Sequence, residues 1–157
     1  MSRKNPTLPE DLQARLIEIL NRRLADAIDL QLQSRQAYWN AKGPTLLSLR
    51  ELFARVTEEV EEYANQIAGR IVQLGGKAEG TARTVAGRSS LDGSGLASAG
   101  HSDALATTLS DFGRHTRYAS AQATELQDAD TAEIFTEIAQ GIDQWLWFVQ
   151  TSQPAET

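Results

Sequence analysis

The chain has 157 residues, enough for one hydrophobic core and too few for two. Its hydrophobic content of 41% and charged content of 23% are ordinary for a soluble globular protein, and no apolar run reaches the roughly 18 residues that a membrane span needs. The formal net charge of −6 argues against tight binding to a phosphate backbone, and the absence of cysteine excludes disulfides, thiolate metal sites and cysteine nucleophiles.

The ends of the chain are expected to be short tails on one domain that spans residues 1–157. Residues 1–8 and 153–157 form these tails, and only Arg3 and Lys4 make a basic segment. Because no hydrophobic stretch follows these two residues, the N-terminus does not read as a secretory signal. We therefore expect a cytoplasmic protein without membrane contact.

A first helix is predicted by apolar residues that recur at three- and four-residue steps from Leu12 to about Trp39. The pair Thr7 and Glu10 resembles a capping box, with Pro9 tolerated in the first turn. The pattern stops at Gly43-Pro44. The sequence thus predicts one long helix with its cap at Thr7.

A second helix is predicted from Thr45, as its N-cap, to Leu74, before the stop signal Gly75-Gly76. The connection that follows, residues 77–100, is polar and rich in Gly and Ser. A connection of this length is uncommon and often has a specialised role. Inside it, the segment "TARTVAGRSS" is expected to form a short helix.

Two more helices are predicted in the C-terminal part, the third from about Ser102 to Leu126 and the fourth from Asp130, which forms a capping box with Glu133. No segment has the period of a strand. Two helices, a long crossover and two more helices predict an all-α four-helix bundle with the topology of ferritin-like folds.

The second helix has two contrasting faces on a helical wheel. Its apolar face must meet the core and comprises Leu49, Leu52, Phe53, Val56, Val60, Tyr63, Ile67, Ile71 and Leu74. The opposite face comprises Glu51, Ala54, Glu58, Glu62, Asn65 and Gly69, with Arg50 at its edge. This second face is either a solvated acidic surface or part of a site that a loop or another subunit completes. Glycine costs roughly 1 kcal/mol inside a helix, so Gly69 indicates either close approach of another backbone or a lost side chain.

Three segments resemble the Dps family, the mini-ferritins named for DNA protection during starvation. They are "QAYWNAKGPTLLSLRELF", "EEVEEYANQIAGRIVQLGG" and "DADTAEIFTEIAQGIDQWLWF", and the resemblance covers nearly the whole chain. The patterns Trp-Asn-x-x-Gly and Leu-Gly-Gly are its most specific parts. The resemblance implies a hollow dodecameric shell whose di-iron sites lie between two-fold-related subunits, oxidise Fe(II) with hydrogen peroxide and supply a stored ferric mineral.

The five ligand positions of that family are all changed in this chain. The family pattern has His, His, Asp, Asp and Glu, and at the matching positions this sequence has Tyr38, Arg50, Ala54, Asn65 and Gly69. Iron sites of this class need imidazole and carboxylate donors, whereas Arg50 places a permanent cation at the iron position. We therefore expect that the usual ferroxidase centre and its activity are absent. Iron binding in the cavity or pores remains possible.

Acidic residues of the second helix are candidates for mineral nucleation, which the resemblance implies for this helix. The candidates are Glu51, Glu58 and Glu62, and plain solvated surface is the alternative, stronger for Glu59 and Glu61 on other sides of the wheel. Near the fourth helix, acids resemble those that ring three-fold pores and draw cations inward. These pore candidates are Asp128, Asp130 and Glu133, although the last two could instead form the capping pair.

The two histidines and three tryptophans are expected to be structural. His101 is interpreted as a cap or surface residue and His115 as a packed or surface residue, since neither has a partner at metal-ligand spacing. The tryptophans at positions 39, 145 and 147 are interpreted as packing residues.

Three functions follow from these features. The first is a Dps-like shell that sequesters iron and protects against oxidative stress without a ferroxidase centre. The second is a natural or engineered structural shell, or a co-assembling partner of an active paralogue, without iron chemistry. The third is a DNA-protecting nucleoid protein, which is disfavoured because twelve chains of formal charge −6 repel DNA unless Mg²⁺ bridges them.

Overall fold

The protein is an all-α bundle in a computed structural model that describes residues 8–43, 46–92 and 101–152. Four long helices run along the bundle: α1 (Glu10–Asn40), α2 (Leu46–Gln73), α5 (His101–Glu125) and α6 (Ala129–Thr151). Helix α3 (Ala82–Arg88) is short and lies in the crossover. No strand occurs in the described part of the chain. The four-helix bundle and the short crossover helix predicted from sequence are confirmed.

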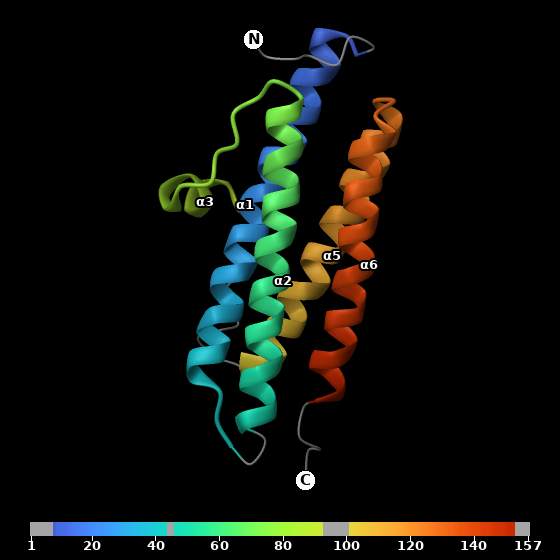
Figure 1. Ribbon diagram of the computed structural model, residues 1–157. Helices are drawn as coiled ribbons and strands as arrows, with labels where there is room; N and C mark the ends of the chain where they lie inside the picture. The colour runs from blue at the N-terminus through green and yellow to red at the C-terminus, as the bar shows by residue number, and fades with distance from the viewer. Residues whose placement is uncertain (1–7, 44–45, 93–100, 153–157) are drawn as a thin grey trace.

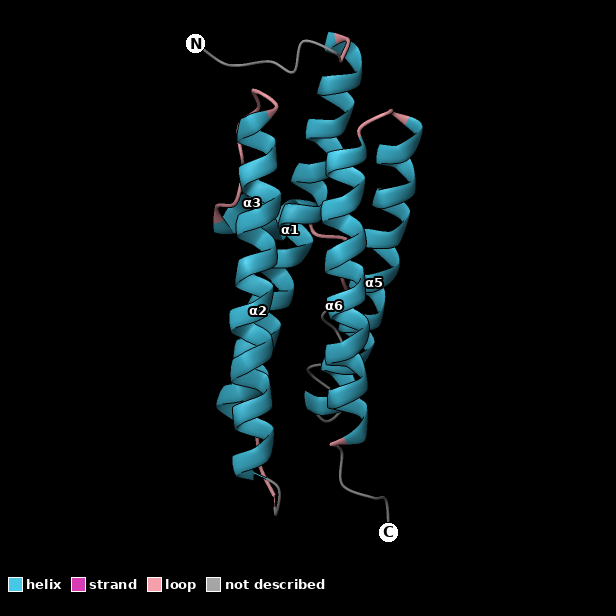
Figure 2. Cartoon of the chain, turned by 45° about the vertical axis from the view of Figure 1, so that its right-hand side comes forward, coloured by secondary structure: helices cyan, strands magenta, loops and turns pink. Residues whose placement is uncertain are grey.

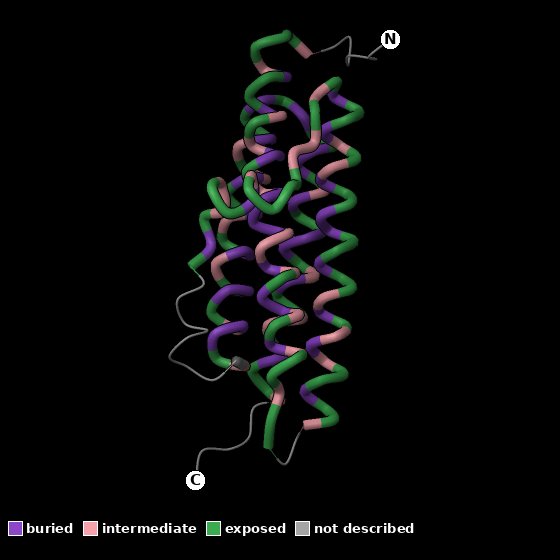
Figure 3. Tube along the Cα trace, turned by 90° about the vertical axis from the view of Figure 1, so that its left-hand side faces the viewer, coloured by how far each residue is buried: buried purple, intermediate pink, exposed green. Residues whose placement is uncertain are grey.

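The helices form two antiparallel pairs, α1 with α2 and α5 with α6 (Figure 1). Further contacts join α1 to α5 and α2 to α6, which closes the bundle around one core, while α3 packs on the outside of α1. Figure 2 shows the same two pairs from another side. The crossover carries the chain back along the bundle, so that α2 and α5 run in the same direction. The buried residues recur along the long helices on the sides that face one another, as the colouring of the trace in Figure 3 shows.

The core face of α2 is the one that the helical wheel predicts. Its members are buried, apart from the partly buried Leu52. At the end of α2, Gly75 has a φ of +84°, and Gly76 donates to the carbonyl of Ile71 at 2.9 Å. This is a Schellman ending, which favours glycine in the left-handed position. A Cβ on Gly76 would lie 2.8 Å from Ile17, so this second glycine lets the chain turn closely past α1.

Two of the expected caps are wrong. Helix α1 begins at Glu10 with Pro9 at the N-cap position and no side-chain cap, while Thr7 lies outside the described residues. Helix α6 begins one residue before Asp130, and Asp128 is its N-cap, accepting from the backbone N–H of Thr131. The N-cap expected at residue 45 also lies outside the described residues. For α3, Thr81 caps the helix by accepting from the N–H of Thr84.

Candidate functional site: the outward face of α2

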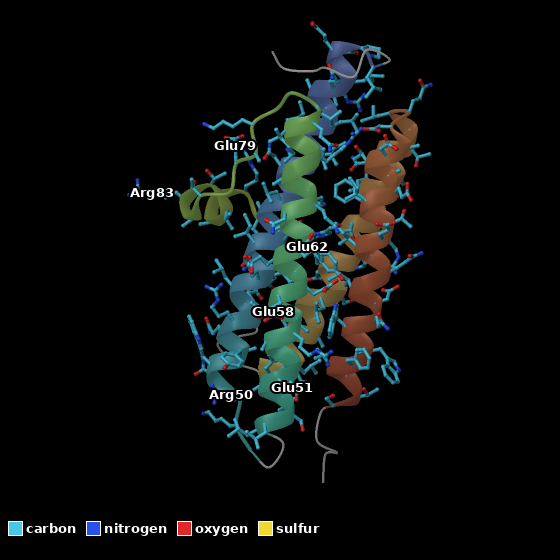
Figure 4. The ribbon with its side chains drawn as sticks, in the orientation of Figure 1. Arg50, Glu51, Glu58, Glu62, Glu79 and Arg83 are labelled. Carbon is cyan, nitrogen blue, oxygen red and sulfur yellow. The ribbon has the colours of Figure 1, made fainter. Side chains whose placement is uncertain are left out.

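The acidic side chains of α2 form an exposed row along the bundle. Glu51, Glu58 and Glu62 are all exposed, and Figure 4 shows them following α2 from its first turns to its middle. Glu59 and Glu61 are exposed as well. Carboxylates spaced in this way along a helix can attract cations to its surface, because their mutual repulsion favours counter-ions.

Tyr38 and Arg50 stack on each other beside this row. The guanidinium carbon of Arg50 lies 4.7 Å from the centre of the Tyr38 ring, which is the geometry of a cation–π contact. Tyr38 comes from the last turns of α1 and Arg50 from the second turn of α2, so the α1–α2 connection brings these two positions together. At a site with this exposure such a contact contributes about 0.5–1 kcal/mol. The aromatic face of Tyr38 attracts the charge of Arg50, and the pair offers no anionic ligand to a metal ion.

The remaining three positions on this face offer no charged donor. Ala54 is half-buried, and Asn65 and Gly69 are exposed. A Cβ added to Gly69 would meet nothing within 4 Å, so no neighbouring group in this chain requires glycine there. Among the described residues, no group of three or more His, Cys, Asp and Glu side chains is placed to hold a metal ion. Within the described part of a single chain, these positions therefore bring no imidazole or carboxylate donors together.

The five positions cannot meet within one chain. Arg50 and Asn65 are fifteen residues apart on the same helix, which at 1.5 Å per residue separates them by about 22 Å along its axis. Tyr38 and Arg50 lie at one end of that span, and Asn65 and Gly69 lie at the other. Any site that uses both ends requires a second subunit to bring one end to the other.

The three pore candidates divide into one buried and two exposed carboxylates. Asp130 and Glu133 are exposed in the first turns of α6. Glu133 also lines a shallow pocket of about 480 Å³ together with Ser120, Thr124 and Thr136. The prediction that Asp130 and Glu133 form the capping pair is wrong, which leaves both carboxylates available at the surface.

Asp128 instead has an internal structural role. Both of its carboxylate oxygens accept from Arg70 Nη2 at 2.9 Å, and only 4% of the residue is exposed. Burial alone raises the pKa of Asp128, but hydrogen bonds from Thr131 and Arg70 and the charge of Arg70 outweigh it and lower the pKa below its usual range. Asp128 thus joins α6 to α2 and is less suited than its two neighbours to line a pore.

A buried polar cluster around Asp26 was not anticipated from the sequence. Asp26 of α1 is fully buried and accepts from the Ser90 backbone N–H at 2.7 Å. Arg23 Nε lies 3.2 Å from it, and His115 Nδ1 of α5 lies 3.4 Å from it and 3.1 Å from Ser90 Oγ. The one available signal was the presence of two aspartates, Asp26 and Asp29, within the otherwise apolar run "LADAIDL". His115 is therefore a packed residue, as expected, whereas the side chain of His101 lies outside the described residues.

The tryptophans differ in burial. Trp145 is half-buried and packs against the core, whereas Trp39 and Trp147 are 67% and 59% exposed. Trp145 is therefore a packing residue, as expected, whereas Trp39 and Trp147 leave most of their surface exposed in the single chain, and the Trp147 ring lies edge-on to Phe148. As a separate observation, the described helices contain no apolar segment of the length that a membrane span requires.

Comparison with known proteins identifies relatives of this bundle. Residues 17–152 match the ferritin-like domain family. The DNA protection during starvation protein of Agrobacterium fabrum is 34% identical over 146 residues, which are 91% of this chain and 90% of that protein. The solved structure of DpsA14 from Streptomyces coelicolor has a TM-score of 0.88 at 26% identity, covering 97% of this chain and 92% of that one. Mycobacterium smegmatis Dps has the same fold, with a TM-score of 0.87 at 24% identity over 96% of this chain and 93% of that one.

Proposed function

This chain belongs to the ferritin-like family and within it to the Dps mini-ferritins, and on that premise we propose that it is an iron-storing shell subunit without the usual ferroxidase centre. The observation that carries the proposal is the stacked pair of Tyr38 and Arg50, at two of the five positions where the family pattern has ligands. A guanidinium that is protonated at all physiological pH values repels Fe²⁺. The other three positions provide no carboxylate or imidazole.

In the proposed assembly, twelve chains enclose a cavity. Iron enters as cargo through pores that carry Asp130 and Glu133, whose exposure supports this role. Hydrogen peroxide then oxidises Fe(II) to Fe(III) at the surface of the growing mineral and is itself reduced to water, and the exposed row of Glu51, Glu58 and Glu62 binds the first ions. Carboxylate oxygens are suitable donors for such hard cations. Removal of iron from solution limits its reaction with peroxide and so protects the cell from oxidative damage.

Iron retention tests this proposal. Fe(II) and hydrogen peroxide are added to the purified assembly, which is then separated by size exclusion and analysed for iron. We expect many iron atoms per chain in the wild-type assembly and a clear loss in Glu58→Gln/Glu62→Gln. The matched control is Glu59→Gln/Glu61→Gln, which removes the same charge from other sides of α2. An assembly that elutes without iron, or equal losses in both variants, would contradict the assigned role of the row.

A second candidate is a shell subunit without iron chemistry that co-assembles with an active paralogue. The absence of imidazole and carboxylate donors at all five positions favours it. Because the two ends of the site lie about 22 Å apart along α2 and this chain lacks the ligands at both, iron would be oxidised between active members of a mixed shell. If this candidate is correct, an assembly of this chain alone should retain no iron. Mixed shells with an active member would then retain iron.

Restoring the ligands tests the alignment on which both candidates depend. The combined variant Tyr38→His, Arg50→His, Ala54→Asp, Asn65→Asp and Gly69→Glu is expected to oxidise Fe(II) rapidly with peroxide, whereas wild type does not. Stopped-flow absorbance follows the reaction. The position of these residues on an exposed face supports tolerance of the changes, since an added Cβ at Gly69 meets no neighbour in the chain. A correctly assembled variant that stays slow would show that the site assignment is wrong.

A further inference from the structure

A pocket between α1 and the crossover brings three arginine side chains together in an otherwise acidic chain. Its volume is about 570 Å³, within the range of small-ligand sites. Arg22 and Arg23 of α1 and Arg88 of α3 line it, together with the carboxylates of Glu18 and Glu79. These five side chains carry three positive and two negative charges, whereas the whole chain has a net charge of −6. The fully buried Asp26 carboxylate also lies 3.2 Å from Arg23 Nε, so each of the three guanidinium groups faces one carboxylate and the charges around the pocket balance.

Two of the arginines in this pocket have unused hydrogen-bonding capacity. Arg23 Nε and Arg88 Nη1 are buried, and neither makes a hydrogen bond within the described part of the chain. Arg23 Nε has the Asp26 carboxylate at 3.2 Å and Arg88 Nη1 has the Glu79 carboxylate at 3.6 Å, so both have ion-pair contacts only. Burying an N–H donor without an acceptor costs free energy. Binding of an oxyanion to which these two N–H groups can donate would therefore be favourable.

The two carboxylates that line the pocket compete only weakly with such an anion, whereas the buried Asp26 holds Arg23 more firmly. Glu18 pairs with Arg22 at 3.1 Å, but both side chains are more than half exposed, and exposed pairs contribute little. Glu79 lies farther from Arg88 than a hydrogen bond allows. A dianion with three or four acceptor oxygens can bind more than one guanidinium at once, which a single carboxylate at these distances does not do.

The wall of the pocket is held in place without any ligand. Asn21 of α1 accepts from the backbone N–H of Glu79 and donates to the carbonyl of Lys77, both at 3.0 Å. A Cβ on Gly80 would lie 2.8 Å from Ile28, so the crossover is pressed against α1 there. A site that is already formed loses little conformational entropy when a ligand binds.

We propose that this pocket binds a phosphate-type dianion through the guanidinium groups of Arg22, Arg23 and Arg88. The shared chemistry is a tetrahedral oxyanion with two negative charges, present in inorganic phosphate and in small phosphate monoesters. One planar guanidinium group can donate hydrogen bonds to two such oxygens at once. This binding is separate from the iron chemistry proposed above, since it uses the opposite charge and other elements of the fold.

Titration calorimetry of the assembled protein in a phosphate-free buffer tests the site, with inorganic phosphate and adenosine monophosphate as separate ligands. We expect Arg88→Gln to weaken phosphate binding at least about tenfold, the effect of losing one charge-assisted hydrogen bond. The matched control is Arg83→Gln, which changes the same charge on the same helix. Figure 4 shows Arg83 reaching away from the bundle, and it does not line the pocket. Its effect should stay below about twofold.

A further variant keeps the test valid if Arg88→Gln lowers stability. Gly87 lines the pocket, and a Cβ added there meets nothing within 4 Å, so Gly87→Glu should add a repelling carboxylate without a clash. We expect it to abolish phosphate binding at a melting temperature no lower than that of wild type. Tighter binding of the monophosphate than of phosphate would support a monoester as the source, and equal binding would support free phosphate.

Three results would overturn the proposal. The first is the absence of binding of both ligands at millimolar concentration, and the second is equal weakening by Arg83→Gln and Arg88→Gln. The third is binding of duplex DNA alone, since that would show a diffuse surface rather than a pocket for a small dianion.

Discussion

Replacing Asp26 by Asn tests how strongly one buried carboxylate holds the crossover against the bundle. Asp26 is fully buried and accepts from Ser90 N at 2.7 Å and from Ser90 Oγ at 3.0 Å, with Arg23 and His115 as further neighbours. Asn keeps the shape but removes the charge. It also directs an amide N–H₂ toward groups that are themselves donors and leaves the Arg23 guanidinium without its counter-charge.

The expected loss of stability follows from these contacts. Removing one partner of a buried ion pair costs about 3–5 kcal/mol, and a hydrogen bond to a charged group contributes about 1.5–3 kcal/mol. The Arg23 side chain keeps 13% exposure, so water can partly solvate it and the lower end applies. We therefore expect a loss of about 3 kcal/mol in the free energy of unfolding. For a chain of this size that corresponds to a fall of about 6–12 °C in the melting temperature.

Thermal unfolding followed by circular dichroism measures this loss, at one protein concentration because association shifts the transition. Tryptic cleavage after Arg83 and Arg88 should also accelerate, since the crossover loses its attachment to α1. The control is Asp143→Asn, which makes the same substitution in a pair with Arg117 whose side chains are about half exposed. We expect a change below about 0.5 kcal/mol there. Melting temperatures of the two variants within about 2 °C of each other would refute the reasoning.

Two further predictions concern the contacts of α2 with α6. Gly141→Ala should cost about 1–3 kcal/mol, because its Cβ would clash with the Tyr63 hydroxyl oxygen. Adding Tyr63→Phe to this variant should relieve the clash. Gly69→Ala, whose Cβ has no neighbour within 4 Å, should instead raise the free energy of unfolding by up to about 1 kcal/mol. Equal denaturation midpoints for Gly141→Ala and Gly69→Ala would contradict this prediction. Although burial raises the pKa of Asp128, its hydrogen bonds and the charge of Arg70 lower it below the ordinary 3.8. The stabilisation by this carboxylate is therefore complete above about pH 4 and is lost as the pH falls through the folded-state pKa. The difference in unfolding free energy between wild type and Asp128→Asn should shrink below about pH 4, and a difference that does not change with pH would contradict the ion pair.

Local sequence patterns are sufficient to predict the helices of this protein. The core face of α2 follows from the three- and four-residue spacing of residues such as Phe53, Val60 and Ile67, because side chains at these steps share one side of a helix. The end of α2 follows from Gly75-Gly76, since few other residues adopt a left-handed φ without cost. The outward orientation of Arg50, Asn65 and Gly69 follows from the same periodicity. These features depend on neighbours within one turn of the chain.

The tertiary structure alone decided which polar groups meet across the bundle. Asp128 pairs with Arg70, and Asp26 meets Ser90 and His115, over separations of 58 to 89 residues. No periodicity encodes such contacts, because they depend on how whole helices pack and on the path of the crossover. The same holds for the stacking of Arg50 on Tyr38, which requires the ends of α1 and α2 to lie side by side. The sequence by itself thus determined the faces of the helices, and packing determined the partners of the charges on them.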